Sequence, residues 1–249
     1  MIVLKYAKDP DDPEDISIRI TAFNRGPDAA NLHLIPQVTF GNTWSWPLEP
    51  PKRPEVRESS PGVITAEHPT LGCMHIHCLS SPSPVDVDAQ AGNSSDDNEV
   101  IPELLFTENN TNHERLHDGQ NPFPYVKDAF HDHIIPSHRL KQDADAATST
   151  QSPASFVNPD KTGTKSAAHY TFKNVPGNGG CAVVRLKMTR KTFEQDPTID
   201  DEEVFDANIE ARQNEADEFY ETISQAVGTA DLRNVSRQAL GGMLWWGPY

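Results

Sequence analysis

The sequence has few of the features that a secreted or membrane-bound protein needs. Its 249 residues include only three cysteines, an odd number that argues against a disulfide framework and fits a reducing compartment. No apolar run approaches the roughly 20 residues of a membrane span, and the first residues, Met1 to Lys5, lack the apolar region of a signal peptide. We therefore expect a cytoplasmic protein that does not contact a membrane.

Positive charge and hydrophobic residues are also scarce. Lys and Arg number 21 against 37 Asp and Glu, which gives a formal net charge of -16, and only 36% of the residues are hydrophobic. An acidic chain repels phosphate backbones and anionic lipid headgroups, so we expect no nucleic-acid partner. A neutral partner such as a sugar is compatible with this charge.

Most motifs of nucleophilic, nucleotide and metal chemistry are missing. The sequence has no Gly-x-Ser-x-Gly elbow and no phosphate-binding loop. Cys73, His75 and His77 are residue types that bind zinc, but the fourth ligand is missing and their spacing is not that of a zinc knuckle or ribbon. We expect ordinary strand packing here, with no metal and no cofactor.

An acidic stretch from Asp206 to Gln225 raises the possibility of a carboxylate pair, which glycosidases use as general acid and as base or nucleophile. On a helix, however, Glu218 and Glu221 share a face that should be solvated, and no apolar surroundings would raise the pKa of either. We expect a solvated helix face here rather than a catalytic pair.

Alternation of apolar and polar residues predicts β-strands in residues 1–195. The pattern is clearest in 16–40 and again in 165–173 and 181–189, and each pair of runs is separated by turn-forming residues, which predicts two β-hairpins. Further strands are expected in four places: 1–6, 62–67, 73–79 and 103–108. The proline-rich segment 47–62 is expected to be an irregular loop, and 126–135 an irregular strand or a helical turn.

The remaining segments are polar inserts or helices. Two inserts, at 80–98 and 141–153, have almost nothing to bury and are expected to be disordered. After Pro197 the apolar spacing changes to that of a helix, and a second amphipathic helix follows Asp231, a predicted N-cap. Residues 196–249 are therefore predicted to form a helical unit after the β domain. Because this last helix has an apolar face with little left to cover it, we expect the chain to be truncated.

Aromatic residues beside amides and acids form two segments that could hold a sugar, by ring stacking and hydrogen bonds to hydroxyls. One is Asn42-Thr-Trp-Ser-Trp46, and the other runs from Thr107 through Asn112 to Asp128. The alternatives are a structural loop with buried aromatic rings and a contact with a neighbouring domain. The candidate residues are Trp44, Trp46, Asn112, Tyr125 and Lys127.

Several short motifs in the same order resemble the large fungal and bacterial proteins of glycoside hydrolase family 63, which are related to mannosyl-oligosaccharide glucosidase and mannosylglycerate hydrolase. They span almost the whole chain: Tyr6-Ala-Lys8, Ile18-Arg-Ile-Thr21, Asn24-Arg-Gly-Pro27, Asn42-Thr-Trp-Ser-Trp46, Leu105-Phe-Thr-Glu-Asn109, Tyr125-Val-Lys-Asp-Ala-Phe130, Gly163-Thr-Lys165, Ala167-Ala-His-Tyr170, Glu215-Ala-Asp-Glu-Phe-Tyr220, Arg237-Gln-Ala-Leu240 and Gly242-Met-Leu-Trp245.

This resemblance implies a mainly β fold: an incomplete supersandwich-like β-sandwich, a helical linker, and the first helix of a truncated (α/α)6 toroid. In the family the toroid holds two carboxylates that invert an α-glycosidic bond, and they lie beyond this chain. The resemblance thus implies an accessory N-terminal part of a hydrolase of α-linked gluco-oligosaccharides, inactive alone, whose substrate is bound through a missing catalytic domain. The alternatives are a non-enzymatic carbohydrate-binding or interaction module and a fragment without a ligand.

Overall fold

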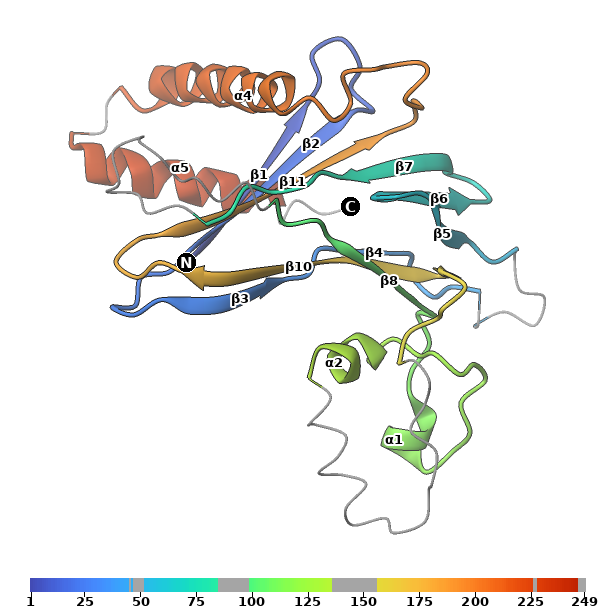
Figure 1. The fold of residues 1–249 in the computed structure, drawn as a ribbon. Helices are drawn as coiled ribbons and strands as arrows, with labels where there is room; N and C mark the ends of the chain where they lie inside the picture. The colour runs from blue at the N-terminus through green and yellow to red at the C-terminus, as the bar shows by residue number, and fades with distance from the viewer. Residues whose placement is uncertain (45, 47–51, 85–98, 136–155, 226–227, 246–249) are drawn as a thin grey trace.

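The computed structural model shows a mainly β protein with antiparallel sheets and a few helices (Figure 1). The insert expected at 141–153 and most of that at 80–98 lie outside the described residues. Those residues are 1–44, 46, 52–84, 99–135, 156–225 and 228–245.

A seven-stranded sheet forms one layer, and β1 and β9 are its two edges. Every neighbouring pair for which the register is known is antiparallel. In spatial order the strands are β1 (Ile2–Lys8), β2 (Ile16–Phe23), β11 (Cys181–Thr189), β7 (Gly72–Cys78), β6 (Val63–His68), β5 (Glu55–Ser60) and β9 (Thr162–Gly163).

A smaller, four-stranded sheet forms the second layer around the long strand β10 (Lys165–Val175). β10 pairs antiparallel with each of the other three strands. These are β3 (Ala30–Leu34), β4 (Gln37–Thr39) and β8 (Glu103–Thr107).

The two sheets share one hydrophobic core. Phe106, Tyr170 and Phe172 of the smaller sheet and Val56 and Val184 of the larger sheet have no exposed surface. Full burial of side chains of this size contributes roughly 1.5–3 kcal/mol each. The phenol hydroxyl of Tyr170 donates a hydrogen bond of 2.8 Å to the carbonyl of Leu79, so the polar end of the ring is satisfied inside the core.

Neither predicted hairpin forms, because each pair of strands is divided between the two sheets. β2 lies in the larger sheet and β3 in the smaller one, and β10 and β11 are separated in the same way. The alternating pattern shows that a strand is half buried, but it does not identify the partner of the strand. The segments that look like hairpin turns are instead crossings from one sheet to the other.

These two crossings lie against each other and exchange backbone hydrogen bonds. The amide of Asn24 donates to the carbonyl of Gly180 over 2.8 Å, and the amide of Asn178 donates to the carbonyl of Gly26 over 2.7 Å. Asn178 and Gly179 have positive φ angles of 57° and 111°. Asparagine and glycine tolerate this conformation, which explains their use at the corner.

The other local predictions had mixed outcomes. The strands expected at 62–67, 73–79 and 103–108 are confirmed as β6, β7 and β8, and that at 1–6 as β1. The irregular loop expected at 47–62 is wrong in its second half, because β5 fits between Pro54 and Pro61 and pairs with β6. Within 126–135 the helical alternative holds, as α2 (Ala129–Ile134).

The C-terminal unit contains the two predicted helices, α4 (Glu202–Ile223) and α5 (Ala230–Trp245). The carboxylate of Asp201 caps α4 by accepting hydrogen bonds from the amides of Glu203 and Val204. The predicted N-cap at Asp231 is wrong, because α5 already begins at Ala230 and the hydroxyl of Thr229 accepts from the amide of Leu232. No helix in the described part of the chain is long and apolar enough to cross a membrane.

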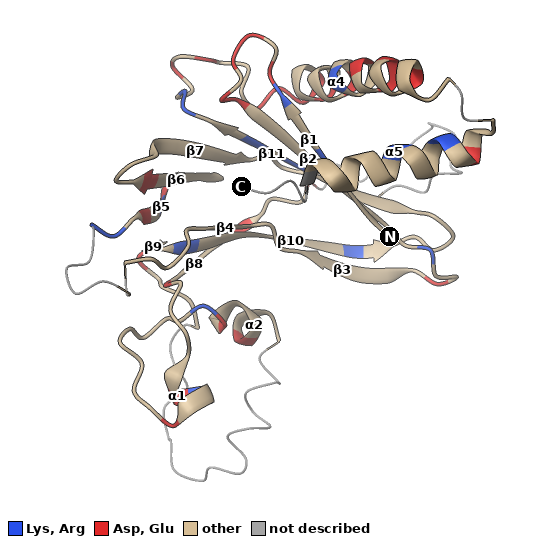
Figure 2. Cartoon of the chain, turned by 180° about the vertical axis from the view of Figure 1, so that it is seen from behind, with Lys and Arg blue, Asp and Glu red and all other residues tan. Residues whose placement is uncertain are grey.

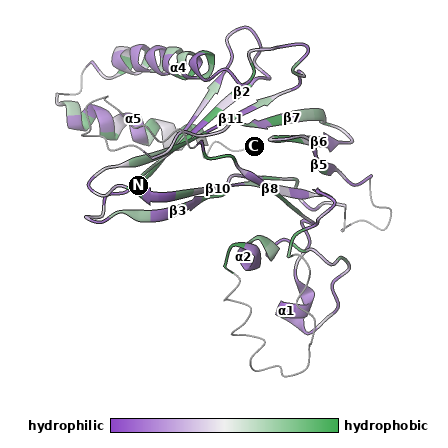
Figure 3. Ribbon diagram, viewed as in Figure 1, coloured by the Kyte–Doolittle hydropathy of each residue, from purple (hydrophilic) through white to green (hydrophobic). Residues whose placement is uncertain are grey.

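Only the first half of α4 packs on the larger sheet. Phe205 and Ile209 form a small cluster with Ala7 of β1. Farther along, Phe219 and Ile223 are more than half exposed, as are several apolar residues of α5. Figure 3 shows that hydrophobic and hydrophilic residues alternate in bands along both helices. The apolar stripe expected along α4 is therefore real, but the described residues cover only its beginning.

Candidate functional site

Trp44 is the buried part of the Asn42-Thr-Trp-Ser-Trp46 segment, with 6% of its surface exposed. The guanidinium of Arg53 lies 6.0 Å from the ring centroid of Trp44 and 4.5 Å from that of Phe123. Such cation–π contacts hold a loop to its neighbours. A buried Trp44 fits the alternative of a structural loop with buried aromatic rings.

Glu108 joins this aromatic group to the end of the smaller sheet. Its carboxylate accepts hydrogen bonds from Arg53 over 2.5 Å and from the hydroxyl of Thr164 over 2.7 Å. Thr164 can come so close because its neighbour is Gly163, at which a Cβ atom would lie 2.2 Å from the carbonyl oxygen of Thr107. Glycine is required at that crossing of β9 and β8.

Amide side chains tie three loops together next to Glu108. Asn109 donates from its side chain to the carbonyl of Phe40 over 2.7 Å, and its own carbonyl accepts from the side chain of Asn42 over 3.1 Å. The backbone amide of Asn109 donates to the hydroxyl of Thr164 over 2.8 Å. Asparagine is suited to this role because one side chain can both donate and accept.

Asn112 organises the following loop and caps the short helix α1 (His113–His117). Its side-chain oxygen accepts from the amide of Arg115 over 3.1 Å and from the side chain of Asn121 over 3.0 Å. Its nitrogen donates to both carboxylate oxygens of Asp128, at 3.2 Å each. Arg115 also pairs with Asp128, at 3.1 Å. Both polar atoms of the Asn112 side chain therefore already bond to protein groups.

Tyr125 and Lys127 lie on a segment of bends and turns that runs beside 108–110. The carbonyl of Tyr125 accepts from the amide of Glu108 over 2.9 Å, and the ammonium of Lys127 donates to the hydroxyl of Thr111 over 3.2 Å. Lys165 donates to the carbonyl of Lys127, and its pKa is lowered by burial and by the nearby charge of Lys127.

The structure thus brings four of the five candidate residues into one set of loops at the end of the smaller sheet. We call this set the amide cluster: Asn42, Trp44, Arg53, Glu108, Asn109, Asn112, Tyr125, Lys127, Asp128 and Thr164. Trp46 follows it in the chain, and its side chain is 80% exposed. Exposed donors and an exposed indole beside a rigid loop could contact hydroxyl groups of a sugar or the surface of another domain.

Arg53 and Glu108 are central to the amide cluster but were not among the predicted residues. Glu108 lies inside one of the family-like motifs, Leu105-Phe-Thr-Glu-Asn109, whereas Arg53 lies in the proline-rich segment 47–62, for which the sequence predicts an irregular loop. Arg57 in the same segment pairs with Glu67 across β5 and β6 at 3.0 Å. The only signal for Arg53 in the sequence is that it and Arg57 lie just before and within a short strand, β5.

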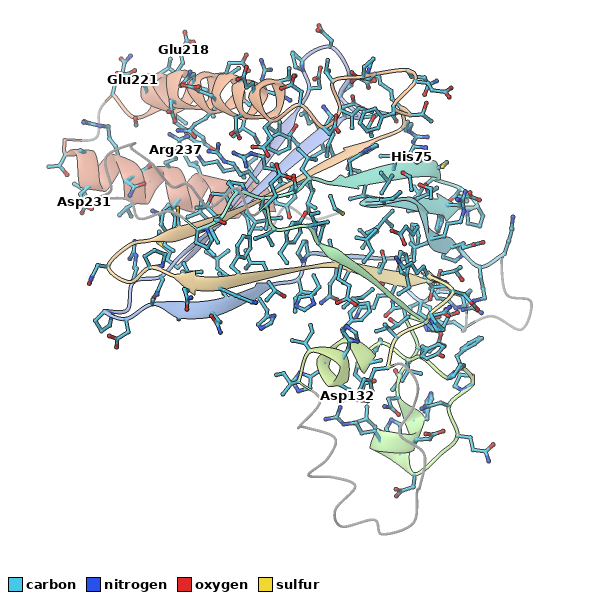
Figure 4. All side chains as sticks on the ribbon, viewed as in Figure 1. His75, Asp132, Glu218, Glu221, Asp231 and Arg237 are labelled. Atoms are coloured by element: carbon cyan, nitrogen blue, oxygen red, sulfur yellow. The ribbon has the colours of Figure 1, made fainter. Side chains whose placement is uncertain are left out.

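The acidic helix α4 contributes an ion pair with the sheet. Arg185 donates to both oxygens of Asp206, at 3.2 and 2.6 Å, and Arg19 donates to the same carboxylate at 3.2 Å. Burial opposes ionisation of Asp206, but the hydrogen bond and charge of Arg185 hold its pKa below the usual value. Asp217, Glu218 and Glu221 are exposed, and Asp217 pairs with Arg237 of α5. Figure 4 shows Glu218 on the side of α4 that faces away from α5.

Cys73, His75 and His77 lie on β7, and all three cysteines of the chain are free thiols. Within the described ranges, no three His, Cys, Asp or Glu side chains are grouped so that they could hold a metal ion. His77 is buried and its ring centroid lies 5.7 Å from that of Phe193. Burial lowers the pKa of His77 to about 4, with a smaller effect from His75.

Comparison with known proteins gives one informative relative. No model of a protein family matches the sequence. The chain is 33% identical over 257 residues to the uncharacterized protein YMR196W of Saccharomyces cerevisiae, and the similarity covers 98% of this chain. It covers 22% of the yeast protein, so the chain spans about a fifth of the length of this curated relative.

Proposed function

We propose that this chain is the accessory N-terminal part of a glycoside hydrolase resembling family 63, with α-linked gluco-oligosaccharides as the substrate class. In this proposal the two sheets are the β-sandwich, α4 is the helical linker and α5 is the first helix of a catalytic toroid. The catalytic acid and base belong to the rest of the enzyme, and the chain does not hydrolyse a glycosidic bond by itself.

The observation that carries the proposal is the order of the parts. Two antiparallel sheets occupy the chain up to Thr189 and two helices follow it, which is the order that the motif resemblance implies. Similarity to about a fifth of a longer yeast protein agrees with a region that works as part of a larger chain. The exposed carboxylates of α4 agree with chemistry located elsewhere.

The amide cluster has a defined role in this proposal. Its loops are rigid because side-chain amides and carboxylates bond to one another, and they present Trp46 and Lys127 at the surface. Loops restrained in this way, with an exposed aromatic side chain, suit a contact with the catalytic domain.

A second candidate function is a carbohydrate-binding module that needs no catalytic domain. The specific observation in its favour is Trp46, which is 80% exposed. An exposed indole can stack on a pyranose ring.

Isothermal titration calorimetry of maltotriose binding to residues 1–249 distinguishes the two candidate functions. The accessory role predicts no saturable binding at millimolar sugar. Saturable binding that Trp46→Ala removes would favour the module and overturn the proposal. Phe193→Ala, which changes a 45% exposed ring far along the chain, is the matched control and should leave any binding intact.

A further inference from the structure

Two histidines, a threonine and a glutamate share the outer face of the smaller sheet. Glu103 of β8 is directly opposite His169 of β10, and Thr171 of β10 is directly opposite His33 of β3. Directly paired residues project from the same face of a sheet, and so do residues two apart on one strand. Tyr170, between His169 and Thr171, belongs to the core, so the four side chains face away from it.

His33 and His169 form a hydrogen bond between their rings. Nδ1 of His33 lies 2.8 Å from Nε2 of His169, and the ring centroids are 5.1 Å apart. Such a bond needs a proton on one of the two nitrogens and a lone pair on the other. The pair can therefore hold together without charge or with one positive charge. Two imidazolium rings would have no acceptor between them, and their like charges would repel.

Glu103 supplies negative charge next to His169. Its Oε2 lies 3.6 Å from Nδ1 of His169 and 3.2 Å from Nε2 of His133 on α2. Phe130 of the same helix packs in a cluster with Leu105 of β8, which holds α2 on this face of the sheet. One carboxylate is thus shared by two histidines, and it cannot compensate for a positive charge on every ring.

The surrounding elements carry few other charged residues (Figure 2). β3 has no Lys, Arg, Asp or Glu, and β10 has Lys165 and Lys173 near its ends. α2 adds His131 and Asp132. β3 therefore brings no carboxylate that could pair with a second positive charge.

Burial makes protonation of this pair unfavourable in the folded protein. His169 is 9% exposed, and desolvation lowers its pKa, with a further lowering by the charge of His33 and an opposing effect of Glu103. An unfolded histidine titrates near 6.5. The contribution of the pair to stability is therefore complete above about pH 6.5 and is lost as the pH falls below that value.

The strand that depends on this pair is β3, an edge of the smaller sheet whose neighbour is β10. Leu34 of β3 is buried in the core and Leu32 packs against it, so loosening of β3 would uncover apolar surface. α2 should respond in the opposite way, because a proton on His133 turns its contact with Glu103 into a stronger, charge-assisted hydrogen bond. Mild acid should therefore act on β3 rather than on α2.

We propose that His33 and His169 are a proton-sensitive clasp that holds the edge strand β3 on β10 at neutral pH and loosens it in mildly acidic solution. The second proton taken up by the pair breaks the bond between the rings, and the edge of the core at Leu32 and Leu34 opens. The inference rests on the histidine pair and is independent of the proposed function.

Hydrogen exchange of the purified 249-residue chain at pH 7.5 and pH 5.5, corrected for intrinsic exchange rates, tests this inference. Protection of the backbone amides of β3 should fall about tenfold more than that of β1, an edge strand of the larger sheet. A loss of stability of the whole chain, such as that expected from His77, would act on both strands. An equal fall in β1 and β3, or no fall in β3, would overturn the inference.

A substitution at His33 makes the test specific. His33→Gln, at an exposed position, keeps a hydrogen-bonding side chain that cannot take up a proton. The variant should remove the excess fall in β3, and circular dichroism establishes that it folds. His117→Gln, at an exposed position on α1, is the matched control and should retain the fall. An undiminished fall in His33→Gln would overturn the clasp.

The imidazole resonances of the natural chain give a readout that needs no variant. In a ¹H–¹⁵N nuclear magnetic resonance titration, the two rings of the pair should take up protons in two coupled steps that are more than about one pH unit apart. Independent, single-step titrations of His33 and His169 would contradict the shared proton and with it the clasp.

Discussion

Asp206 connects the larger sheet to α4 through two arginine side chains. The Arg185 side chain is only 11% exposed, and the Asp206 side chain 35%. Removal of this carboxylate would leave Glu202, at 3.3 Å, as the remaining counter-charge of Arg185, and a mostly buried charge that is only partly compensated is costly. Residues on the solvated side of the same helix, such as Glu218, have no such role.

Asp206→Asn should lower the free energy of unfolding at pH 7 by about 1–2 kcal/mol, less than for a fully buried pair because the site is partly solvated. Urea denaturation measures this change, and Glu218→Gln should leave it unaltered. Because the pKa of Asp206 is depressed in the folded state, its contribution is present above the unfolded pKa near 4 and is lost as the pH falls through the folded pKa. Equal stability of both variants would contradict the assigned ion pair.

His77 gives stability a pH dependence in a different range. Its pKa is lowered to about 4 by burial, whereas an unfolded histidine titrates near 6.5. The unfolded chain therefore binds the proton more readily, and the contribution is complete above pH 6.5 and is lost as the pH falls toward 4.

His77→Phe should remove that dependence. Between pH 7 and pH 4.5 the natural chain should lose about 2–3 kcal/mol more stability than this variant. The reason is that, over about two pH units, the unfolded chain binds one proton at His77 that the folded chain does not bind. Urea unfolding at both pH values measures the difference. His113→Gln, at an exposed position on α1, is the control and should retain the full loss; the same loss in His77→Phe would show that another group is responsible.

At the scale of elements, the sequence predicts strands better than it predicts their partners. The runs around Ile18 and Val184 have the alternation of a strand with one buried face, and both are strands. Their assignment to hairpins was wrong because turn-forming residues are equally suited to a crossing between sheets. Strand β5 was not predicted because its six residues lie between Pro54 and Pro61, and the proline-rich composition indicates a loop.

Only part of the candidate site could be predicted from the sequence. Asn112, Tyr125 and Lys127 lie close together in sequence, so local composition identified their loop. The partners that hold it, Arg53 and Thr164, are distant in the chain and meet Glu108 only through the pairing of β5 with β9 and of β8 with β10. Long-range strand pairing is the information that a local pattern lacks.

The contact between the two crossings provides a test of the corrected topology. Gly177→Ala would place a Cβ atom 2.4 Å from the carbonyl oxygen of Pro27, so one of the crossings must shift. We expect a loss of about 1–3 kcal/mol, the usual cost of overpacking. Thermal unfolding measures it, and Gly41→Ala, where no atom lies within 4 Å of the added carbon, should have little effect. An unchanged melting temperature in Gly177→Ala would contradict the close approach.

At the scale of the whole molecule, exposed apolar side chains are grouped on α5 and on β1. Leu232, Val235, Met243 and Leu244 of α5 are all more than half exposed, and so are three apolar residues of β1. Scattered exposed leucines are ordinary, but groups of this kind mark interaction sites. The distribution agrees with a region that works inside a larger assembly.

The most direct test of this account is the hydrolysis of p-nitrophenyl α-glucoside and of α-linked glucose disaccharides. Residues 1–249 are assayed beside a full-length protein of this kind, such as yeast YMR196W. The account predicts no turnover by residues 1–249 and turnover by the full-length protein. Turnover by residues 1–249 alone would contradict it and would direct attention to the carboxylates of α4, and inactivity of both would remove the basis for a hydrolase.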